Sequence, residues 1–212
     1  MAVSLLTCAT LAARLAAATP GSTVPVGSDC PALVDIRDLS RPGVTVDATG
    51  RTLTNGLRLW DVSGLTWRGG TIRGGASMYA ADVRRGANLT FDGVTFTAAK
   101  VGMVVNATKG ITVRNSLFIG LRSDGIDFTG AGDNGLAENN RFTGFAPGKT
   151  TCISPNYSSP LYGLSKAECT ALGGEWTDTY HPDAIQTWGG WGTLVARGNR
   201  IDGDTQGIDT FG

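Results

Sequence analysis

Four residues in two short strings are of the types that catalyse proton transfer. His181, the single histidine of the chain, and Asp183 belong to the string HPDAIQTW, and Asp124 and Asp127 belong to SDGIDF. Carboxylates that lie close together raise one another's pKa or bind a cation such as Ca²⁺, and a histidine beside them accepts a proton near neutral pH. We therefore predict a catalytic site of these four residues, with the three aspartates as possible Ca²⁺ ligands and no other cofactor. In the alternative, Asp124 and Asp183 cap turns and His181 bonds to the preceding loop.

An internal repeat predicts that the two strings lie side by side. Six strings align on one another, namely GLRLW, AADVR, GMVVN, GIDFT, AIQTW and GIDTF, and they begin at Gly56, Ala80, Gly102, Gly125, Ala184 and Gly207. The steps between them are 24, 22, 23, 59 and 23 residues. A period of about 23 residues indicates stacked structural units, whose equivalent residues form columns. Asp124 and Asp183 fall one unit apart in the stack, so we expect their backbones to lie about 5 Å apart.

Each unit has the pattern of short strands separated by turns. Apolar residues alternate with other residues in the first set of strings, which places every second residue in the interior. A second set, TWRGGTI, TFDGVTF, TVRNSLF, LAENNRF and VARGNRI, aligns a column of aliphatic and aromatic residues. Asn140 and Asn199 share a turn column, where stacked amides can hydrogen-bond. Units of this length leave no room for helices, so successive units should pair strand on strand in parallel.

The fold class predicted is all-β, a right-handed single-stranded parallel β-helix with an N-terminal capping helix. Over about residues 33–212 the chain resembles the right-handed parallel β-helix proteins of the pectate-lyase-like superfamily, through its xTxxNxxF-type turns and its G-I-D strands. The resemblance implies a polysaccharide-active protein. The string SDGIDF also looks like part of the Asp-bearing strand of polygalacturonase-type hydrolases. Their adjacent Asp-Asp pair and their Gly-His-Gly and Arg-Ile-Lys motifs are absent, and no arginine pattern clearly matches pectate lyases.

The N-terminal segment, one insertion and the last residues depart from the regular repeat. Residues 1–32 are expected to form an N-terminal cap, with a helix that Thr10 caps. Residues 33–212 are expected to form the coils, and a disulfide-pinned loop is inserted at about 146–181, where the period fails. The sequence stops at Gly212, just after a first strand, and the open edge predicts a longer native chain or an oligomer.

One outward face of the stack carries side chains that suit a sugar. Its two columns read Arg58, Asp82, Val104, Asp127, Gln186, Asp209 and Trp60, Arg84, Asn106, Thr129, Trp188, Phe211. Aromatic rings beside hydrogen-bonding groups suit the faces and hydroxyls of sugar rings. The predicted substrate-binding residues, drawn from these columns and from the turns before SDGIDF and GMVVN, are Gln186, Trp188, Asp209, Phe211, Arg122 and Lys100. The alternative is an ordinary solvated sheet, with Trp188 covered by the insert.

Charge, hydropathy and cysteines limit the partners and the cellular compartment expected for this protein. Lys plus Arg and Asp plus Glu both number 18, so no net charge favours nucleic acid, and no apolar run is long enough to insert into a membrane. Cys8 with Cys30, and Cys152 with Cys169, are local pairs that suit two disulfides, and four buried thiols are the alternative. Disulfides predict an extracellular or periplasmic protein of bacterial or phage-like character.

Three functions remain open, and all of them have a polysaccharide as the partner. The first is a lyase or C5-epimerase acting on a uronic-acid-containing glycan, in which Ca²⁺ or Arg122 neutralises the sugar carboxylate and His181 or Lys100 takes the adjacent proton. The second is a glycoside hydrolase that uses two of the aspartates. The third is a non-catalytic glycan-binding adhesin or phage-fibre segment. The histidine that accompanies the acids favours the lyase or epimerase.

Overall fold

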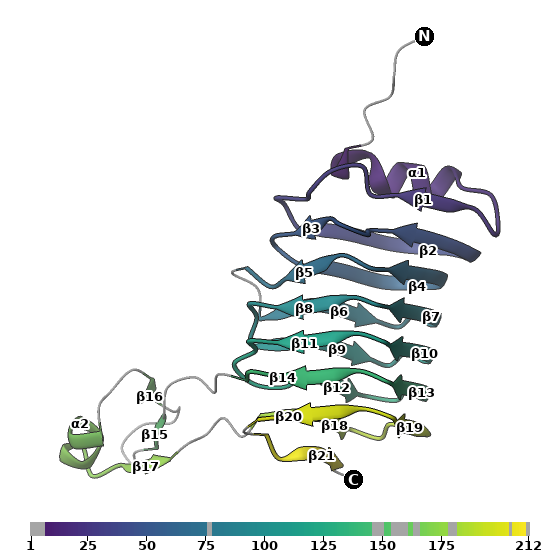
Figure 1. Ribbon diagram of the computed structural model, residues 1–212. Helices are drawn as coiled ribbons and strands as arrows, with labels where there is room; N and C mark the ends of the chain where they lie inside the picture. The colour runs from purple at the N-terminus through teal and green to yellow at the C-terminus, as the bar shows by residue number, and fades with distance from the viewer. Residues whose placement is uncertain are drawn as a thin grey trace.

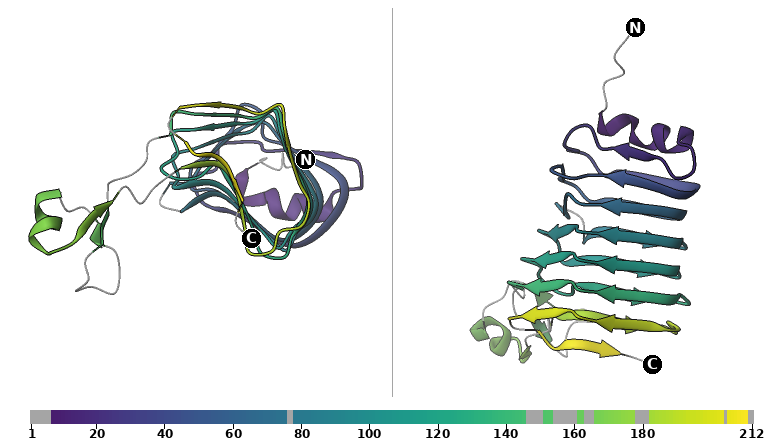
Figure 2. Two further views of the ribbon diagram at one scale, coloured as in Figure 1. Left: turned by 90° about the horizontal axis from the view of Figure 1, so that it is seen from below. Right: turned by 45° about the vertical axis from the view of Figure 1, so that its right-hand side comes forward.

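Short parallel strands stack along one axis, and each turn of the chain about that axis forms one coil (Figure 1). The computed structural model describes residues 7–75, 78–145, 151–153, 161–162, 166–177, 182–203 and 205–210. Each coil passes through three faces, and seen end-on the coils superpose as one closed loop (Figure 2). This arrangement is the parallel β-helix that the repeats predict.

Face 1 carries the first set of repeated strings. It is built from the first halves of two long strands, β2 (Val34–Asp47) and β4 (Leu57–Arg68), followed by β6 (Tyr79–Arg84), β9 (Val101–Asn106), β12 (Ile126–Thr129), β18 (Asp183–Trp188) and β21 (Gly207–Thr210). Ile126 pairs with Met103 on one side and with Ile185 on the other. The 59-residue step therefore leaves the register of face 1 as the repeats predict it.

Faces 2 and 3 complete each coil. Face 2 holds the second halves of β2 and β4 together with β1 (Thr23–Pro25), β7 (Ala87–Asp92), β10 (Lys109–Arg114), β13 (Asp133–Glu138) and β19 (Leu194–Arg197). Face 3 holds β3 (Thr52–Leu53), β5 (Thr71–Arg73), β8 (Thr95–Thr97), β11 (Leu117–Ile119), β14 (Arg141–Thr143) and β20 (Arg200–Asp202). All of these pairings are parallel, so each coil supplies backbone partners to the next.

The interior is filled by the columns that the alternation predicts. On face 3, the fully buried rings of Phe96, Phe118 and Phe142 stack with 4.7 Å between successive centroids. The column needs room on face 1, because a Cβ on Gly102 would lie 2.7 Å from the Phe118 ring. Small residues at the start of the first set of strings are therefore a packing requirement of the aromatic stack.

A ladder of side-chain hydrogen bonds holds the turn between faces 2 and 3. The Asn140 Nδ2 donates to Asn199 Oδ1 (3.1 Å), and Asn140 Oδ1 accepts the backbone N–H of Ser116 (3.0 Å). One position earlier, Asn115 and Asn139 adopt φ angles of 51° and 53°, which asparagine tolerates better than most residues. The predicted amide column is thus confirmed.

The N-terminal end of the stack is covered by a short helix (Figure 1). A 3₁₀ turn, η1 (Cys8–Thr10), leads into α1 (Leu11–Ala17), which buries Leu11 and Leu15 against the core. The prediction that the side chain of Thr10 caps this helix is wrong. Its hydroxyl donates instead to the carbonyl of Thr7 (3.0 Å), because the preceding 3₁₀ turn already directs the chain into the helix.

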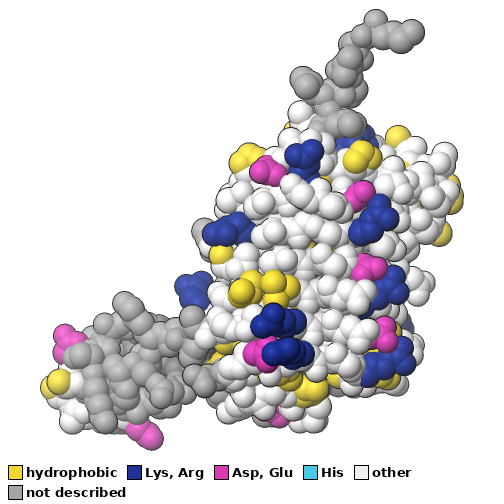
Figure 3. All heavy atoms as spheres, in the orientation of Figure 1, with side chains coloured by type: hydrophobic (Ala, Val, Ile, Leu, Met, Phe, Trp, Pro, Cys, Tyr) yellow, Lys and Arg dark blue, Asp and Glu magenta, His cyan; other side chains and the backbone are white. Residues whose placement is uncertain are grey.

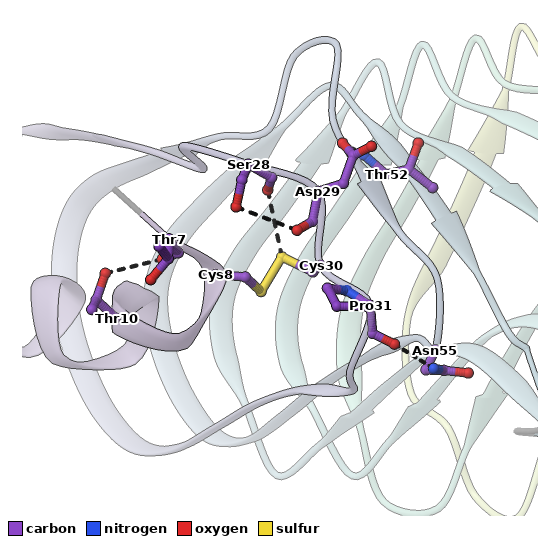
Figure 4. The surroundings of a disulfide bond; sticks show 9 residues. All are labelled: Thr7, Cys8, Thr10, Ser28, Asp29, Cys30, Pro31, Thr52 and Asn55. Carbon is purple, nitrogen blue, oxygen red and sulfur yellow. Dashed lines mark hydrogen bonds between the residues drawn. A yellow bond between two sulfur atoms is a disulfide. The ribbon is translucent and has the colours of Figure 1, made fainter. Parts of the chain in front are cut away.

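A disulfide between Cys8 and Cys30 ties this cap to the first coil (Figure 4). Nearby, Asp29 accepts the backbone N–H of Thr52 (2.9 Å), and the Asn55 side chain donates to the carbonyl of Pro31. The segment around Cys30 is therefore bonded both to the cap and to the following coil, so the cap and the stack form one structure.

The residues between β14 and β18 add a small antiparallel sheet to the side of the stack (Figures 1 and 2). Its elements are β15 (Thr151–Ile153), β16 (Leu161–Tyr162), α2 (Lys166–Ala171) and β17 (Glu175–Thr177). The disulfide between Cys152 and Cys169 joins β15 to α2, so both predicted disulfides are formed. Strands of two or three residues carry too little alternation to be recognised in a sequence, which is why the insert was expected to be only a loop.

Charged side chains also follow the register. On face 2, Arg114 pairs with Asp92 at 2.8 Å and Arg197 with Glu138 at 2.7 Å, one coil apart in each case. Figure 3 shows basic and acidic side chains adjoining one another in a row along the stack. Exposed pairs of this kind contribute about 0–1 kcal/mol each, so this row is structural. Within the described residues, none of the helices is long and apolar enough to span a membrane.

The aromatic stack predicts a large difference between two neighbouring substitutions on β11. Phe118→Ala removes a fully buried ring that is stacked on both sides and should cost about 3–5 kcal/mol of unfolding free energy. Ile119→Ala alters an outward side chain that is 37% exposed. This substitution should change the free energy of unfolding by less than about 0.5 kcal/mol. Urea unfolding followed by circular dichroism measures both; equal costs would contradict the packing described.

Candidate functional site

The outward side of face 1 is hollowed along the stack. A recess of about 400 Å³ lies over β6, β9, β12 and β18, and its lining includes Tyr79, Arg84, Asn106, Asp127 and Trp188. A second hollow of about 540 Å³ continues towards β4 and shares Tyr79 and Arg84 with the first. We call the two hollows together the groove. It runs across successive strands, parallel to the axis of the stack.

Asp127 lies at the floor of the recess. It points outward from β12 and yet is only 9% exposed, and its Oδ1 has no hydrogen-bond partner in the described part of the chain. Burial, reinforced by the negative charges of Asp124 and Asp183 and opposed by Lys100, raises the pKa of Asp127 to about 8. At neutral pH the recess therefore contains a protonated carboxyl, which can donate a hydrogen bond.

The other two aspartates are bound into the turns beneath Asp127. Asp124 Oδ1 accepts the backbone N–H of Asp183 (2.9 Å), and Asp124 Oδ2 accepts the hydroxyl of Ser123 (2.7 Å). Asp183 is fully buried, and its Oδ2 accepts a hydrogen bond from Gln186 Nε2 (3.0 Å). The Asp124 carboxylate therefore joins adjacent coils, the Asp183 carboxylate is bonded within β18, and both act on Asp127 through their charge.

Four of the other predicted site residues lie near the three aspartates. Gln186 and Trp188 join the aspartates, since Trp188 lines the recess and Gln186 pairs in register with Asp127. Asp209 stands one strand further along, beside Gln186, and Lys100 lies close enough to act on the charge of Asp127.

Of the remaining three predictions, only Arg122 lies among the described residues. The side chain of Arg122 is exposed, and no contact between it and the aspartates occurs within the described ranges. His181 and Phe211 lie outside the described residues.

Several lining residues were not among the predicted ones, and two of these, Arg84 and Tyr79, carry groups that can act on a substrate. Arg84 belongs to the same column as Trp188, and Tyr79 stands two coils before Asp124 in the turn column that precedes each strand. Burial raises the pKa of Tyr79, so its hydroxyl stays protonated. The column alignment contained Arg84 but not Tyr79, which immediately precedes the string AADVR, and it carried no information on which outward positions border a hollow.

The expected Ca²⁺ site stays a prediction. Across the part of the chain that the structure describes, no group of three or more His, Cys, Asp or Glu side chains is arranged to hold a metal ion. Both oxygens of Asp124 already accept hydrogen bonds, and Asp127 keeps its proton at neutral pH. No chemical step below is routed through a metal.

Comparison with known proteins assigns no family to the chain. No protein-family model and no curated protein matches it. Among solved structures, an alginate lyase from Paenibacillus sp. str. FPU-7 is similar over 96% of both chains, with 12% sequence identity and a TM-score of 0.34. A likeness at that TM-score transfers neither activity nor residue roles, so function has to be argued from the groove itself.

The raised pKa of Asp127 predicts that the protein loses stability as the pH rises. In the unfolded chain this carboxyl ionises near 3.8, whereas in the fold it keeps its proton up to about pH 8. Between these values the folded state binds more protons than the unfolded state, so the free energy of unfolding falls with increasing pH. Asp127→Asn removes this pH dependence. Between pH 4 and pH 8 the free energy of unfolding of the variant should therefore rise relative to that of the wild type, by about a few kcal/mol.

Urea unfolding at pH 4, 6 and 8 measures this difference. The groups that act on Asp127 from neighbouring strands and turns are Asp124, Asp183, Lys100 and Tyr79, and all four are retained in the variant. Parallel pH profiles for the two proteins would show that Asp127 ionises normally in the fold.

Proposed function

We propose that this protein is an exported enzyme acting on a uronic-acid-containing polysaccharide, as a lyase or C5-epimerase. The observation that carries the proposal is a protonated carboxyl, Asp127, at the floor of a groove whose lining also contains two arginines, Arg58 and Arg84. A groove that is open along its length suits a chain molecule, and arginine side chains suit the carboxylates of an acidic sugar. The disulfides support export, because such bonds persist in oxidising compartments.

Asp127 has the properties required to activate a uronate for proton loss. Removal of the C5 proton places negative charge on the neighbouring carboxylate, and a hydrogen-bond donor aimed at that group stabilises the charge as it develops. A neutral carboxyl in a water-poor recess is such a donor, whereas an ionised one would repel the substrate. The pKa of about 8 keeps Asp127 in the donating form at neutral pH.

The remaining proton transfers have candidates around the same recess. In a lyase, a base takes the C5 proton, the bond between C4 and O4 breaks, and O4 takes a proton. Tyr79 lines the recess with its hydroxyl protonated and is suited to protonate O4. Lys100, which acts on the charge of Asp127, is a candidate base, and His181, outside the described residues, is the candidate base that the sequence offers. In an epimerase, C5 is instead reprotonated from the opposite face.

A glycoside hydrolase is the second candidate, because a raised carboxyl pKa also suits a general acid. A hydrolase needs a second carboxylate. Asp82 occupies the same column as Asp127 two strands away, so the backbones of the two residues lie about 9.6 Å apart. That separation is close to the roughly 6.5–9.5 Å of inverting enzymes. However, Asp82 is already held in an ion pair with Arg84 at 2.7 Å, which occupies the carboxylate that would have to position a water, and the hydrolase therefore ranks second.

Turnover on acidic polysaccharides tests the proposal. Purified protein incubated with alginate, pectate or a glycosaminoglycan, with and without added Ca²⁺, should produce the absorbance of an unsaturated uronate, or in D₂O should incorporate deuterium at C5. Asp127→Ala should lower kcat/KM by about 100-fold or more, because removal of one hydrogen-bond donor to the developing negative charge costs about that much. Asp92→Asn, a carboxylate on face 2, should leave the rate unchanged.

The products separate the candidates. New reducing ends without unsaturated product identify the hydrolase. Binding of these glycans without turnover or deuterium exchange identifies a non-catalytic glycan-binding protein. Either result would overturn the lyase and epimerase proposal.

A further inference from the structure

Four arginines gather around one tryptophan at the end of the groove that lies away from Asp127. Arg37 and Arg84 lie in register with Trp60 on the strands to either side, with guanidinium carbons 4.4 and 5.1 Å from the ring centroid. Arg58 and Arg85 approach to 4.6 and 5.9 Å. Cations therefore approach the ring from the strands on both sides, and Trp60 serves to hold guanidinium groups.

Two of these arginines line the groove, and carboxylates fix their positions. Arg84 pairs with Asp82 at 2.7 Å, and Arg58 pairs with Asp35 at 3.1 Å. Their side chains keep 36% and 30% of their surface exposed, so each can still accept a ligand. Because the ring and the acids already order both guanidinium groups, a ligand would bind them with little further loss of side-chain entropy.

The charge along the groove favours an anion. The four arginines around Trp60 form ion pairs with three aspartates, Asp35, Asp82 and Asp61, so this network has one positive charge in excess. A chain with negative charge on successive units gains from this excess of positive charge, whereas a neutral glycan does not.

The strand spacing places these cations at regular distances from Asp127. Arg84 is two strands away and Arg58 is three, which corresponds to about 10 and 14 Å. One coil is comparable in height to one pyranose unit, so the arginines lie level with the second and third sugars beyond the one at Asp127. Trp188 lies one strand beyond Asp127 on the other side.

We propose that Arg58 and Arg84, held around Trp60, form a distal subsite that binds the carboxylates of an anionic glycan chain lying along the stack axis. The proposal rests on the proposed function and extends it: the ligand is a polyanionic chain of about four or five sugars, bound within its length. The enzyme should therefore discriminate among oligomers by length, and it should do so through charge.

Binding of uronate oligomers of defined length tests the subsite. Isothermal titration of wild-type protein with oligogalacturonate or oligomannuronate should give at least tenfold tighter binding for a pentamer than for a dimer at 50 mM salt, and the gain should shrink at 500 mM. Arg84→Gln and Arg58→Gln should each weaken pentamer binding about five- to tenfold and leave dimer binding unchanged. Arg114→Gln, an arginine paired in the same way on face 2, is the matched control.

A second variant separates loss of the cation from misfolding of the protein. Arg84→Lys retains the cation and should bind the pentamer within about threefold of the wild type, with thermal unfolding showing that each variant is folded. Equal affinity for dimer and pentamer, or equal losses in Arg84→Gln and Arg114→Gln, would overturn the subsite.

The outcomes also separate the subsite from the proposed reaction. Length-dependent binding that needs Arg84, without turnover of any uronate, leaves the subsite standing and removes the enzyme. Turnover that depends neither on oligomer length nor on Arg84 would support the enzyme and remove the subsite.

Discussion

Parallel pairing between successive coils determines the position of every other group in this molecule. Each coil supplies the backbone partners of the next, so equivalent residues must stand about 4.8 Å apart along the axis. The Phe96–Phe118–Phe142 stack, the ladder from Ser116 to Asn199 and the ion pairs of face 2 all repeat at this spacing. An interaction favourable at one level is thus reproduced at the next, and so is an unfavourable one.

The candidate site arises from an unfavourable repetition of this kind. Register places Asp124 and Asp183 at neighbouring levels, with Asp127 beside them on β12, and burial prevents water from screening their charges. Asp124 and Asp183 are stabilised by hydrogen bonds to backbone and side-chain donors, which leaves Asp127 to take the proton. Burial, and after it the charges of Asp124 and Asp183, favours protonation of Asp127, and the result is a neutral acid in a groove that also contains Arg58 and Arg84.

The sequence was a good guide to everything that depends on the period. The order of strands on face 1, the inward columns and the asparagine turns followed from residue spacing, because spacing and register are the same quantity in a stack of coils. It was a poor guide to outward side chains. Asp127 is 9% exposed, whereas Trp188 on the next strand is 53% exposed, although both belong to outward columns of face 1. Such differences depend on long side chains from neighbouring coils, as with the arginines around Trp60. The short strands of the insert follow no period and left no signal.

The 59-residue step also bears on the order in which the molecule folds. Joining β18 to β12 closes a chain of 59 residues, whereas joining β12 to β9 closes one of 23. The longer loop costs only about 0.8 kcal/mol more in closure entropy, so the stack tolerates the insertion, but the contact is less local than its neighbours. The disulfide within the insert shortens the effective loop. The groove is therefore complete only when this last non-local closure has brought Gln186 and Trp188 beside Asp127, after the earlier coils have formed a template for it.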